Sequence, residues 1–249
     1  MIIPTGREAK EPTGFPLFSI AIDGPAGAGK STVAREVARR LGICYVDTGA
    51  LFRTIGLATH RAGIEAHDEE KLDQFLKTIK LHVVVEGRDF NIFLDGHAIG
   101  EELRERSVGP LASAVSKVPV VRNFLLELER ALGRERSVVM EGRDIGTVVL
   151  PEARFKFFLD ATPEERGRRR YQELIERGQV GATVEEIVEE IRMRDEQDRN
   201  RVHAPLRPAE GAVILDTTGR SIEDVIETIV ATVGRALSTE AFEDKRPRP

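Results

Sequence analysis

The segment from Gly24 to Ser31 constrains the fold of this chain more than any other part of its sequence. It reads G-P-A-G-A-G-K-S and matches the pattern G-x-x-x-x-G-K-[S/T] at every fixed position. The apolar run 17–23 precedes it, and residues 31–41 follow it with apolar side chains at helical spacing. A strand, a glycine-rich loop and a helix in this order predict a phosphate-binding loop, and a chance match would occur in only about one chain of this length in a hundred.

Each residue type in this loop suits a bound triphosphate. Glycines allow backbone N–H groups to point inward at the anion, and the helix that starts near Ser31 directs the positive end of its dipole to the same place. Lys30 is expected to reach the β- and γ-phosphates, and the Ser31 hydroxyl is expected to bind Mg²⁺. The ATP-binding residues predicted here are Gly24, Pro25, Ala26, Gly27, Ala28, Gly29, Lys30, Ser31 and Thr32.

Short apolar runs alternate with helical patterns along most of the 249 residues. Because strands that alternate with helices form parallel sheets with helices on both faces, this rhythm predicts an α/β fold with a doubly wound parallel sheet. A further helix is expected to begin at Thr48, which suits an N-cap. The strands are predicted at residues 17–23, 43–47, 137–140, 155–160 and 212–216, and the other helices at about residues 31–41, 163–177, 183–200 and 222–237.

The middle third of the chain has a different pattern. Residues 81–86 and 90–94 are β-rich runs around the turn-like Gly87-Arg88-Asp89, which predicts an antiparallel hairpin. Two or three helices are expected after it, with Pro110 and Pro119 as breaks. The predicted division is a P-loop core at 17–60 and 133–237, an insert at 61–132, and flexible tails at 1–16 and 238–249.

The composition argues against several classes of protein. The net charge of −5 argues against a general binder of nucleic acid or membranes, because affinity for phosphate groups depends on an excess of Lys and Arg. The single cysteine, Cys44, excludes an internal disulfide and a cysteine-based metal site, and its apolar neighbours predict a buried thiol. No apolar run approaches the ~20 residues of a membrane span, so a soluble, cytoplasmic protein is expected.

The loop alone does not identify the reaction. A switch GTPase also needs a D-x-x-G motif and a base-reading N-K-x-D motif. Residues 216–219 fit the first pattern by letter but follow the last predicted strand, and N-K-x-D is absent from the chain. A kinase for a phosphorylated acceptor instead needs additional cations, because it must hold two anions close together. The arginines available for this purpose are Arg53, Arg143, Arg166, Arg168, Arg169, Arg170, Arg194, Arg199 and Arg201.

Two groups of these arginines have alternative interpretations. The apolar face of helix 183–200 keeps its phase into Arg194 and Asp198. This helix therefore either leaves the core and enters a polar cleft, or carries an ordinary surface ion pair between these two residues. The arginines within 166–170 are, by themselves, better explained as a solvated helix face.

Four segments of the sequence resemble the bacterial cytidylate kinase family. They are I-D-G-P-A-G-A-G-K-S at 22–31, D-T-G-A-L-F-R at 47–53, E-G-R-D-I-G-T-V-V at 141–149 and R-D-E-Q-D-R-N-R at 194–201. The resemblance runs from about residue 18 to residue 237, and the last two segments are far more specific than the loop. It implies an adenylate-kinase-like fold in which the insert binds a nucleoside monophosphate and a short lid lies at 166–182. It also implies a monomer that uses ATP and Mg²⁺ to phosphorylate CMP or dCMP.

The same resemblance implies roles for individual side chains. Lys30, Arg143 and Arg194 would be catalytic, and Arg53 would join the two arginines around the acceptor phosphate or the transferred group. Residues near the cytosine or the sugar would hold the acceptor nucleoside, with Asp198 at the sugar. These substrate-binding residues are Thr48, Phe52, Arg53, Ser113, Arg122, Arg143, Asp144, Arg194, Asp198 and Arg201.

The resemblance places Arg166 and Arg170 on the lid side, where they would reach the ATP phosphates. Two positions depart from the family pattern: Glu141 stands where Asp commonly precedes G-R-D, and Phe52 stands where Tyr is common. These departures leave fine specificity open. The alternatives are a same-fold kinase for UMP, AMP or a non-nucleotide alcohol, and a nucleotide-binding regulatory protein without transferase activity.

Overall fold

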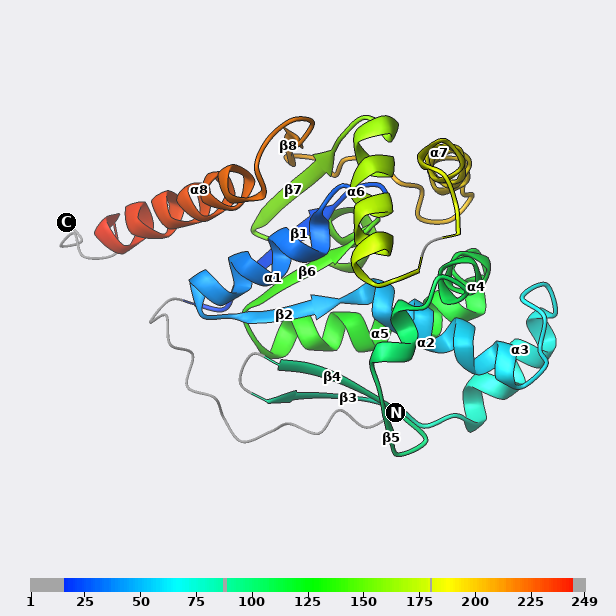
Figure 1. The fold of residues 1–249 in the computed structure, drawn as a ribbon. Helices are drawn as coiled ribbons and strands as arrows, with labels where there is room; N and C mark the ends of the chain where they lie inside the picture. Colours follow the sequence, from blue (N-terminus) through cyan, green and yellow to red (C-terminus); the bar gives the residue numbers. More distant parts are fainter. Residues whose placement is uncertain (1–15, 87–88, 180, 244–249) are drawn as a thin grey trace.

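The computed structural model describes residues 16–86, 89–179 and 181–243 (Figure 1). Five strands form one parallel sheet, and each lies within two residues of its predicted bounds. They are β1 (Ser19–Asp23), β2 (Cys44–Asp47), β6 (Val138–Gly142), β7 (Phe155–Asp160) and β8 (Val213–Asp216). Their order across the sheet is β2-β6-β1-β7-β8, and every neighbouring pair is parallel, which confirms the predicted sheet.

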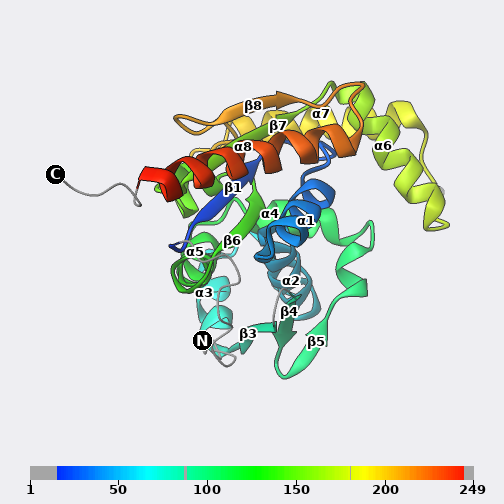
Figure 2. The same ribbon diagram turned by 90° about the vertical axis from the view of Figure 1, so that its left-hand side faces the viewer.

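One face of this sheet is covered by α1 (Lys30–Leu41) and α8 (Ile222–Glu243). Ile20 and Ile22 of β1 are fully buried in the same hydrophobic cluster as Val33 of α1. Figure 2 shows α8 running across this face. Because α8 continues to residue 243, part of the segment predicted as a flexible tail is helical.

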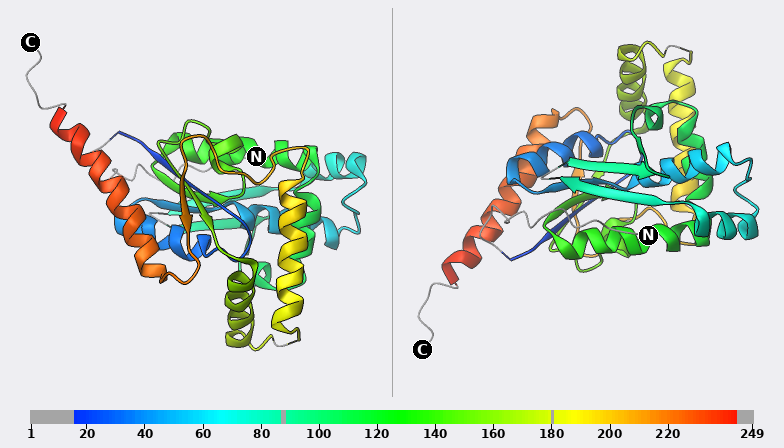
Figure 3. Two further views of the ribbon diagram at one scale, coloured as in Figure 1. Left: turned by 90° about the horizontal axis from the view of Figure 1, so that it is seen from above. Right: turned by 90° about the horizontal axis from the view of Figure 1, so that it is seen from below.

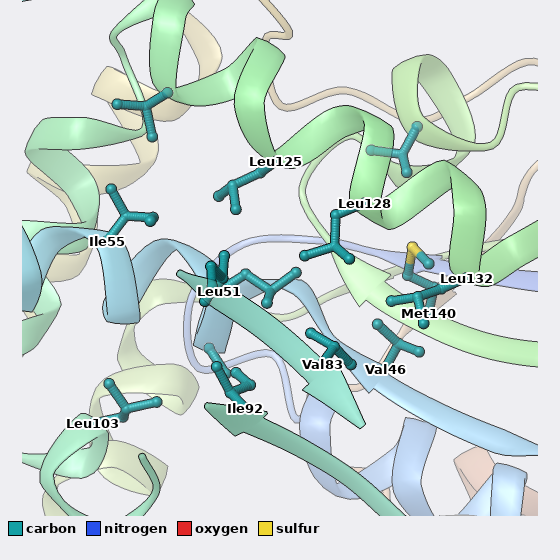
Figure 4. Packing of buried hydrophobic residues seen from close by; sticks show 14 of the residues in the cluster. Val46, Leu51, Ile55, Val83, Ile92, Leu103, Leu125, Leu128, Leu132 and Met140 are labelled. Carbon is teal, nitrogen blue, oxygen red and sulfur yellow. The ribbon is translucent and has the colours of Figure 1, made fainter. Parts of the chain in front are cut away.

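The other face packs against helices and against a second, antiparallel sheet. Figure 4 shows Val83 and Ile92 of that sheet in one cluster with Val46 and Met140 of the parallel sheet. The second sheet therefore shares the main core. The elements that contribute to this cluster are α2 (Thr48–Arg61), α3 (Glu69–Thr78), β3 (Leu81–Glu86), β4 (Asp89–Leu94), β5 (His97–Ile99), the 3-10 helix η1 (Glu101–Arg104), α4 (Val108–Val115) and α5 (Pro119–Glu135).

The antiparallel sheet contains the predicted hairpin and one strand that the sequence analysis missed. β3 pairs with β4 from Leu81 opposite Leu94 to Glu86 opposite Asp89. Residues 87–88 of the predicted turn lie outside the described residues. β5 follows a tight turn and pairs with β4 over three residues, which is too short for a recognisable alternation of apolar and polar side chains.

The expected helix does begin at Thr48, and Pro119 does separate two helices, but the predicted N-cap and the predicted break at Pro110 were wrong. Asp47, and not Thr48, is the N-cap of α2, because its Oδ1 accepts a hydrogen bond from Ala50 N at 2.8 Å. Pro119 is the first residue of α5, and Pro110 lies in the first turn of α4. Proline is tolerated there because the first N–H groups of a helix have no intrahelical partner.

Two helices, α6 (Pro163–Glu176) and α7 (Val184–Arg199), lie side by side and project from the sheet (Figure 3). A capping box between Thr183 and Glu186 starts α7. The short π-helix η2 (Ile145–Val149) follows β6 and lies against β1.

Two features of the fold concern Cys44 and the membrane-span criterion. Cys44 is buried, as its apolar neighbours indicated. Within residues 16–86, 89–179 and 181–243, no helix combines the length and the apolar character that a membrane span requires.

Candidate active site

The glycine-rich loop lies where the parallel strands have their carboxyl ends, the edge at which ligands bind in open α/β sheets. Gly24 has a φ of 149°, and a Cβ there would lie 2.0 Å from the carbonyl oxygen of Leu159, so only glycine fits. Gly29 has a φ of 85° and is the N-cap of α1. The Lys30 amine reaches back and donates a hydrogen bond to the Pro25 carbonyl oxygen at 2.8 Å. The loop has the strand–loop–helix arrangement that the sequence predicts.

Four arginines from separate segments lie near Lys30 or near Arg194, which is one of its neighbours. Arg53 lies on α2, Arg143 follows β6, Arg194 lies on α7 and Arg201 follows α7. Burial, together with the positive charges of Arg143 and Arg194, lowers the pKa of Lys30 to about 7. Burial and Arg143 likewise lower the pKa of Arg194 to about 10, and Arg201 and Arg53 act in the same direction. These five groups form a cluster of mutually repelling cations.

Three donors of this cation cluster are buried without an acceptor. The Nε groups of Arg53, Arg194 and Arg201 have no hydrogen-bond partner among the residues that the structure describes. A buried N–H that lacks an acceptor costs about 1–3 kcal/mol, so each such group calls for an explanation. Repelling cations with unpaired donors favour a bound anion as the missing partner.

Two carboxylates orient the guanidinium groups of the cluster. Asp198, which is buried, accepts a hydrogen bond from Arg143 Nε at 3.1 Å and another from Arg201. Asp47 accepts a hydrogen bond from Arg53 Nη2 at 2.8 Å. Because Asp198 joins α7 to the segment after β6, the charged end of α7 enters a polar site. That is the first of the two interpretations that the sequence left open.

A second polar group lies beside the cation cluster. Arg122 of α5 forms an ion pair with Asp144 and donates a hydrogen bond to the Ser116 carbonyl oxygen at 3.2 Å. Its guanidinium also lies over the Phe52 ring, 5.6 Å from the centroid. Burial raises the pKa of Asp144, whereas Arg122 lowers it. Ser113 is half-buried on α4, and its carbonyl oxygen accepts a hydrogen bond from the Ser116 hydroxyl at 3.0 Å.

The arginines of α6 do not share one environment. Arg166 is fully buried and donates a hydrogen bond from Nη1 to the Ala26 carbonyl oxygen at 3.0 Å, so the solvated-face interpretation is wrong for this residue. Arg168 is exposed, as that interpretation requires. Arg170 is partly exposed and forms an ion pair with Glu173 on its own helix.

Arg169 is a candidate that the sequence analysis did not assign to the site. Its guanidinium donates hydrogen bonds to the Thr217 hydroxyl at 3.0 Å and to the Thr217 carbonyl oxygen at 2.6 Å. A Cβ added to Gly29 would lie 3.9 Å from Arg169 Nη1, so this arginine flanks the loop. A run of adjacent arginines has no periodicity, and only the fold of α6 shows which of them faces the loop.

This geometry agrees with the comparisons to known proteins. A family model described as cytidylate kinase matches residues 20–235. The chain belongs to the cytidylate kinase family. A protein named cytidylate kinase from Geobacter sp. (strain M21) is 45% identical over 88% of this chain and 94% of its own length. Proteins of the same name from Clostridioides difficile and Thermosipho melanesiensis are 45% and 47% identical, each over 86% of this chain and over 97% and 95% of their own lengths.

Solved structures of small-molecule kinases overlap with the chain only weakly. A gluconokinase from Sinorhizobium meliloti has a TM-score of 0.46 and 14% identity, covering 92% of this chain and 99% of its own. A shikimate kinase from Acinetobacter baumannii has a TM-score of 0.43 and 16% identity, covering 88% of this chain and 94% of its own. The family assignment depends on neither.

Glu141, the first departure from the family pattern, lies beside the loop. Its carboxylate accepts a hydrogen bond from the Tyr45 hydroxyl at 2.9 Å. Burial and repulsion from Asp47 raise the pKa of Glu141, and Lys30 and a hydrogen bond from Ser31 lower it. The Ser31 hydroxyl and the Glu141 carboxylate are therefore neighbours. Sequence analysis treated Glu141 only as a variant position, because nothing in a single sequence shows that β2 and β6 lie side by side.

The oxygen atoms of Ser31 and Glu141 suit Mg²⁺, which prefers oxygen ligands. In the described part of the chain, no three His, Cys, Asp or Glu side chains gather in a way that could hold a metal ion. Mg²⁺ at nucleotide sites needs only one or two protein ligands, because phosphate oxygens and water supply the rest. A hydroxyl and one carboxylate beside the loop fit that requirement.

Asp23, at the end of β1, joins the loop to the segment E-G-R-D-I-G. It is buried and accepts hydrogen bonds from Ile145 N and Gly146 N, each at 2.8 Å. Burial raises the pKa of Asp23 to about 6, although both backbone N–H groups lower it. Asp23 therefore fixes the start of η2, and with it the segment that carries Arg143. Sequence analysis did not identify this residue, because an acidic residue before a glycine is typical of any strand end.

Glu129 of α5 is a buried carboxyl group near the Arg122–Asp144 pair. Its Oε1 has no hydrogen-bond partner among the described residues. Burial and repulsion from Asp144 raise its pKa from 4.5 to about 8, and Arg122 and Arg130 only partly oppose this. The folded chain therefore holds this proton more tightly than the unfolded chain does. Stability from this group is complete below pH 4.5 and is lost as the pH rises toward 8.

Replacing Glu129 by Gln is expected to remove this pH dependence. The unfolding free energy of Glu129→Gln, relative to the parent, should rise by about 2–3 kcal/mol between pH 5 and pH 7, since a pKa difference of one corresponds to about 1.4 kcal/mol. Urea unfolding at both pH values measures it. Glu127→Gln, on the exposed side of α5, is the control and should show no such rise. An equal pH response in the two variants would contradict the assignment.

Proposed function

We propose that this chain transfers the γ-phosphoryl group of ATP to CMP or dCMP, giving ADP and CDP or dCDP. The observation that carries this proposal is the cation cluster around Lys30, with the unpaired Nε groups of Arg53, Arg194 and Arg201. A triphosphate bound in the loop would not by itself provide acceptors for the Nε groups of these arginines. A second anion, the acceptor phosphate, satisfies them. Membership of the cytidylate kinase family supports the same reaction.

The chemistry needs positioning and charge stabilisation, and no covalent intermediate on the enzyme. An oxygen of the acceptor phosphate attacks the γ-phosphorus of ATP, the bond from that phosphorus to the β,γ-bridging oxygen breaks, and ADP leaves with the negative charge. Lys30, Arg143 and Arg194 stabilise this charge as it spreads over the transferred group. Arg53 helps to hold the acceptor phosphate.

Mg²⁺ would be held by the Ser31 hydroxyl and the Glu141 carboxylate, together with the ATP phosphates. When bound, it neutralises charge on the β- and γ-phosphates and so assists the departure of ADP. The remaining loop residues, 24–30 and Thr32, hold the triphosphate through their backbone. Arg169 and Arg170 of α6 are proposed to approach it from the lid side, and Gly178 and Gly181 are proposed as hinge points of the lid.

The acceptor nucleoside is proposed to lie beside the Arg122–Asp144 pair. Arginine donors suit the O2 and N3 acceptors of cytosine, and carboxylate or hydroxyl oxygens suit its amino group. Uracil reverses this pattern at O4 and N3, so it leaves buried groups unpaired. The residues proposed to contact the acceptor are Thr48, Phe52, Arg53, Ser113, Arg122, Arg143, Asp144, Arg194, Asp198 and Arg201, with Asp198 at the sugar.

A panel of acceptors tests the proposal. ADP release from Mg-ATP, coupled to NADH oxidation, is measured with CMP, dCMP, UMP, AMP and no acceptor. We expect kcat/KM for CMP or dCMP to exceed that for UMP by roughly ten- to a hundredfold, because each mismatched buried group costs about 1–3 kcal/mol. A higher kcat/KM for UMP or AMP than for CMP and dCMP would show that CMP is not the preferred acceptor. ATP binding without acceptor-dependent ADP release would indicate a regulatory protein.

We further propose that the enzyme acts as a monomer in the cytoplasm, with small-molecule partners and no nucleic acid or membrane partner. The net charge of −5 supports the exclusion of nucleic acid, since its phosphate backbone would be repelled. Light scattering at enzyme concentrations used in the assay measures the oligomeric state.

A further inference from the structure

The buried stripe of α7 continues into an acidic residue that no predicted role uses. Ile187, Ile191, Asp195 and Asp198 are the buried residues of this helix. Asp198 binds the arginines of the cation cluster. Asp195 does not: it is 2% exposed and forms an ion pair with Arg166 of α6, which is 1% exposed.

Arg166 joins three parts of the molecule through one guanidinium group. Its Nε donates to the carbonyl oxygen of Ala161, the first residue of the segment that leads from β7 into α6, at 2.8 Å. Its Nη1 donates to the Ala26 carbonyl oxygen of the glycine-rich loop at 3.0 Å. Its Nη2 donates to Asp195 on α7. The loop, the start of α6 and the C-terminal part of α7 are therefore connected through one buried side chain.

The backbones of the loop, α6 and α7 also pack closely against one another at this point. A Cβ added to Gly27 of the loop would lie 3.0 Å from Arg166 Cβ, and one added to Gly167 would lie 2.3 Å from Val188 Cγ2. The two glycines let α6 approach the loop on one side and α7 on the other, and a Cβ at either position would force a neighbouring atom to shift. The small cluster of Leu174, Ile187 and Ile191 continues the α6–α7 contact away from the loop.

We propose that Arg166 and Asp195 are positioning residues, a buried tie that fixes α7, and therefore Arg194, relative to the loop that holds ATP. This inference rests on the proposed function. Asp195 directly follows Arg194 in the chain, so a shift of α7 at Asp195 moves the Arg194 guanidinium by a similar amount. Because Arg166 is fully buried and its guanidinium donates to the loop backbone and to α7, it acts through α7 rather than as a free phosphate ligand.

The rate of phosphoryl transfer depends on where the Arg166–Asp195 pair holds Arg194. Phosphoryl transfer depends on placing the cations around the transferred group, and a displacement of about 1 Å can lower the rate by about a hundredfold. The loop sets the position of the γ-phosphate, whereas α7 sets the position of Arg194. Any relative movement of the loop and α7 therefore separates the transferred phosphoryl group from the Arg194 guanidinium that stabilises it.

A double-mutant cycle separates positioning from plain structural support. Arg166→Met and Asp195→Leu alone each leave a buried charge without its partner, and both should lower Tm markedly. The double variant replaces the pair by apolar side chains and should recover most of that Tm. Its kcat with CMP, measured well below its Tm, should still be lower than the parent value by about tenfold or more, with KM for ATP and CMP changed less than about threefold.

Two further variants serve as a control and as a milder form of the same change. Arg168→Met, on the exposed side of the same helix, should leave Tm, kcat and both KM values near parental. Asp195→Asn keeps the size of the side chain and should lower kcat severalfold, which preserves the test if the larger changes prevent folding.

Parental kcat in the stable double variant, or parental kcat in a folded Asp195→Asn, would overturn the proposal. A raised KM for ATP in Arg166→Met combined with normal kcat in Asp195→Leu would show instead that Arg166 binds ATP directly. The stability cycle needs no substrate, so a parent that fails to phosphorylate CMP would refute the proposed function while the structural coupling is still measured.

Discussion

Replacing Lys30 by Met is expected to lower kcat with CMP by about a hundredfold or more. Lys30 is buried, its amine lies across the loop at Pro25, and it is the cation that the loop itself supplies to the phosphates. Removing one preorganised charge from a transition state commonly costs about a hundred- to a thousandfold in rate. Met has a similar length and is apolar, so the buried site keeps its packing. Steady-state kinetics with saturating Mg-ATP and CMP provide the measurement.

The control for this variant is Lys77→Met on α3, where the lysine is exposed and forms only a surface ion pair. It should retain the parental kcat. Thermal unfolding should show that Lys30→Met is folded, and the variant is expected to be no less stable than the parent, because it removes a buried charge. Turnover within about threefold of the parent in a folded Lys30→Met would exclude the proposed role of this residue.

Replacing Arg194 by Met should lower kcat by more than tenfold, and by about a hundredfold if its contact forms only in the transition state. The Arg194 Nε is buried without an acceptor among the described residues, and Arg143 and Arg201 repel its charge. Such a group gains most when negative charge develops beside it. The expected signature is a fall in kcat and in kcat/KM by similar factors.

Arg192→Met on the same helix is the matched control, since Arg192 is half exposed and pairs with Glu164 at the surface. Its kinetics should be parental. If Arg194→Met instead raised KM for CMP and left kcat unchanged, Arg194 would bind the acceptor equally in the ground and transition states. That result would transfer the stabilising role to Arg143 and Lys30.

Much of the fold follows from local signals in the chain. The five parallel strands are short apolar runs, and their alternation with helices leaves few possible topologies. The hairpin of β3 and β4 is equally local. Misjudged details, such as β5 and the cap at Asp47, involve segments of only a few residues, where pattern carries little information.

The sequence alone determined the phosphate-binding loop, because its glycines and Lys30 act through backbone conformation within one short segment. It also supplied the arginine-bearing motifs. Only the tertiary structure decided which arginines face one another, that Arg166 is buried against Asp195, and that Glu141 lies beside Ser31. Those relations join residues far apart in the chain, and their energies depend on burial and on distances between charges. A pattern along one strand or helix does not contain that information.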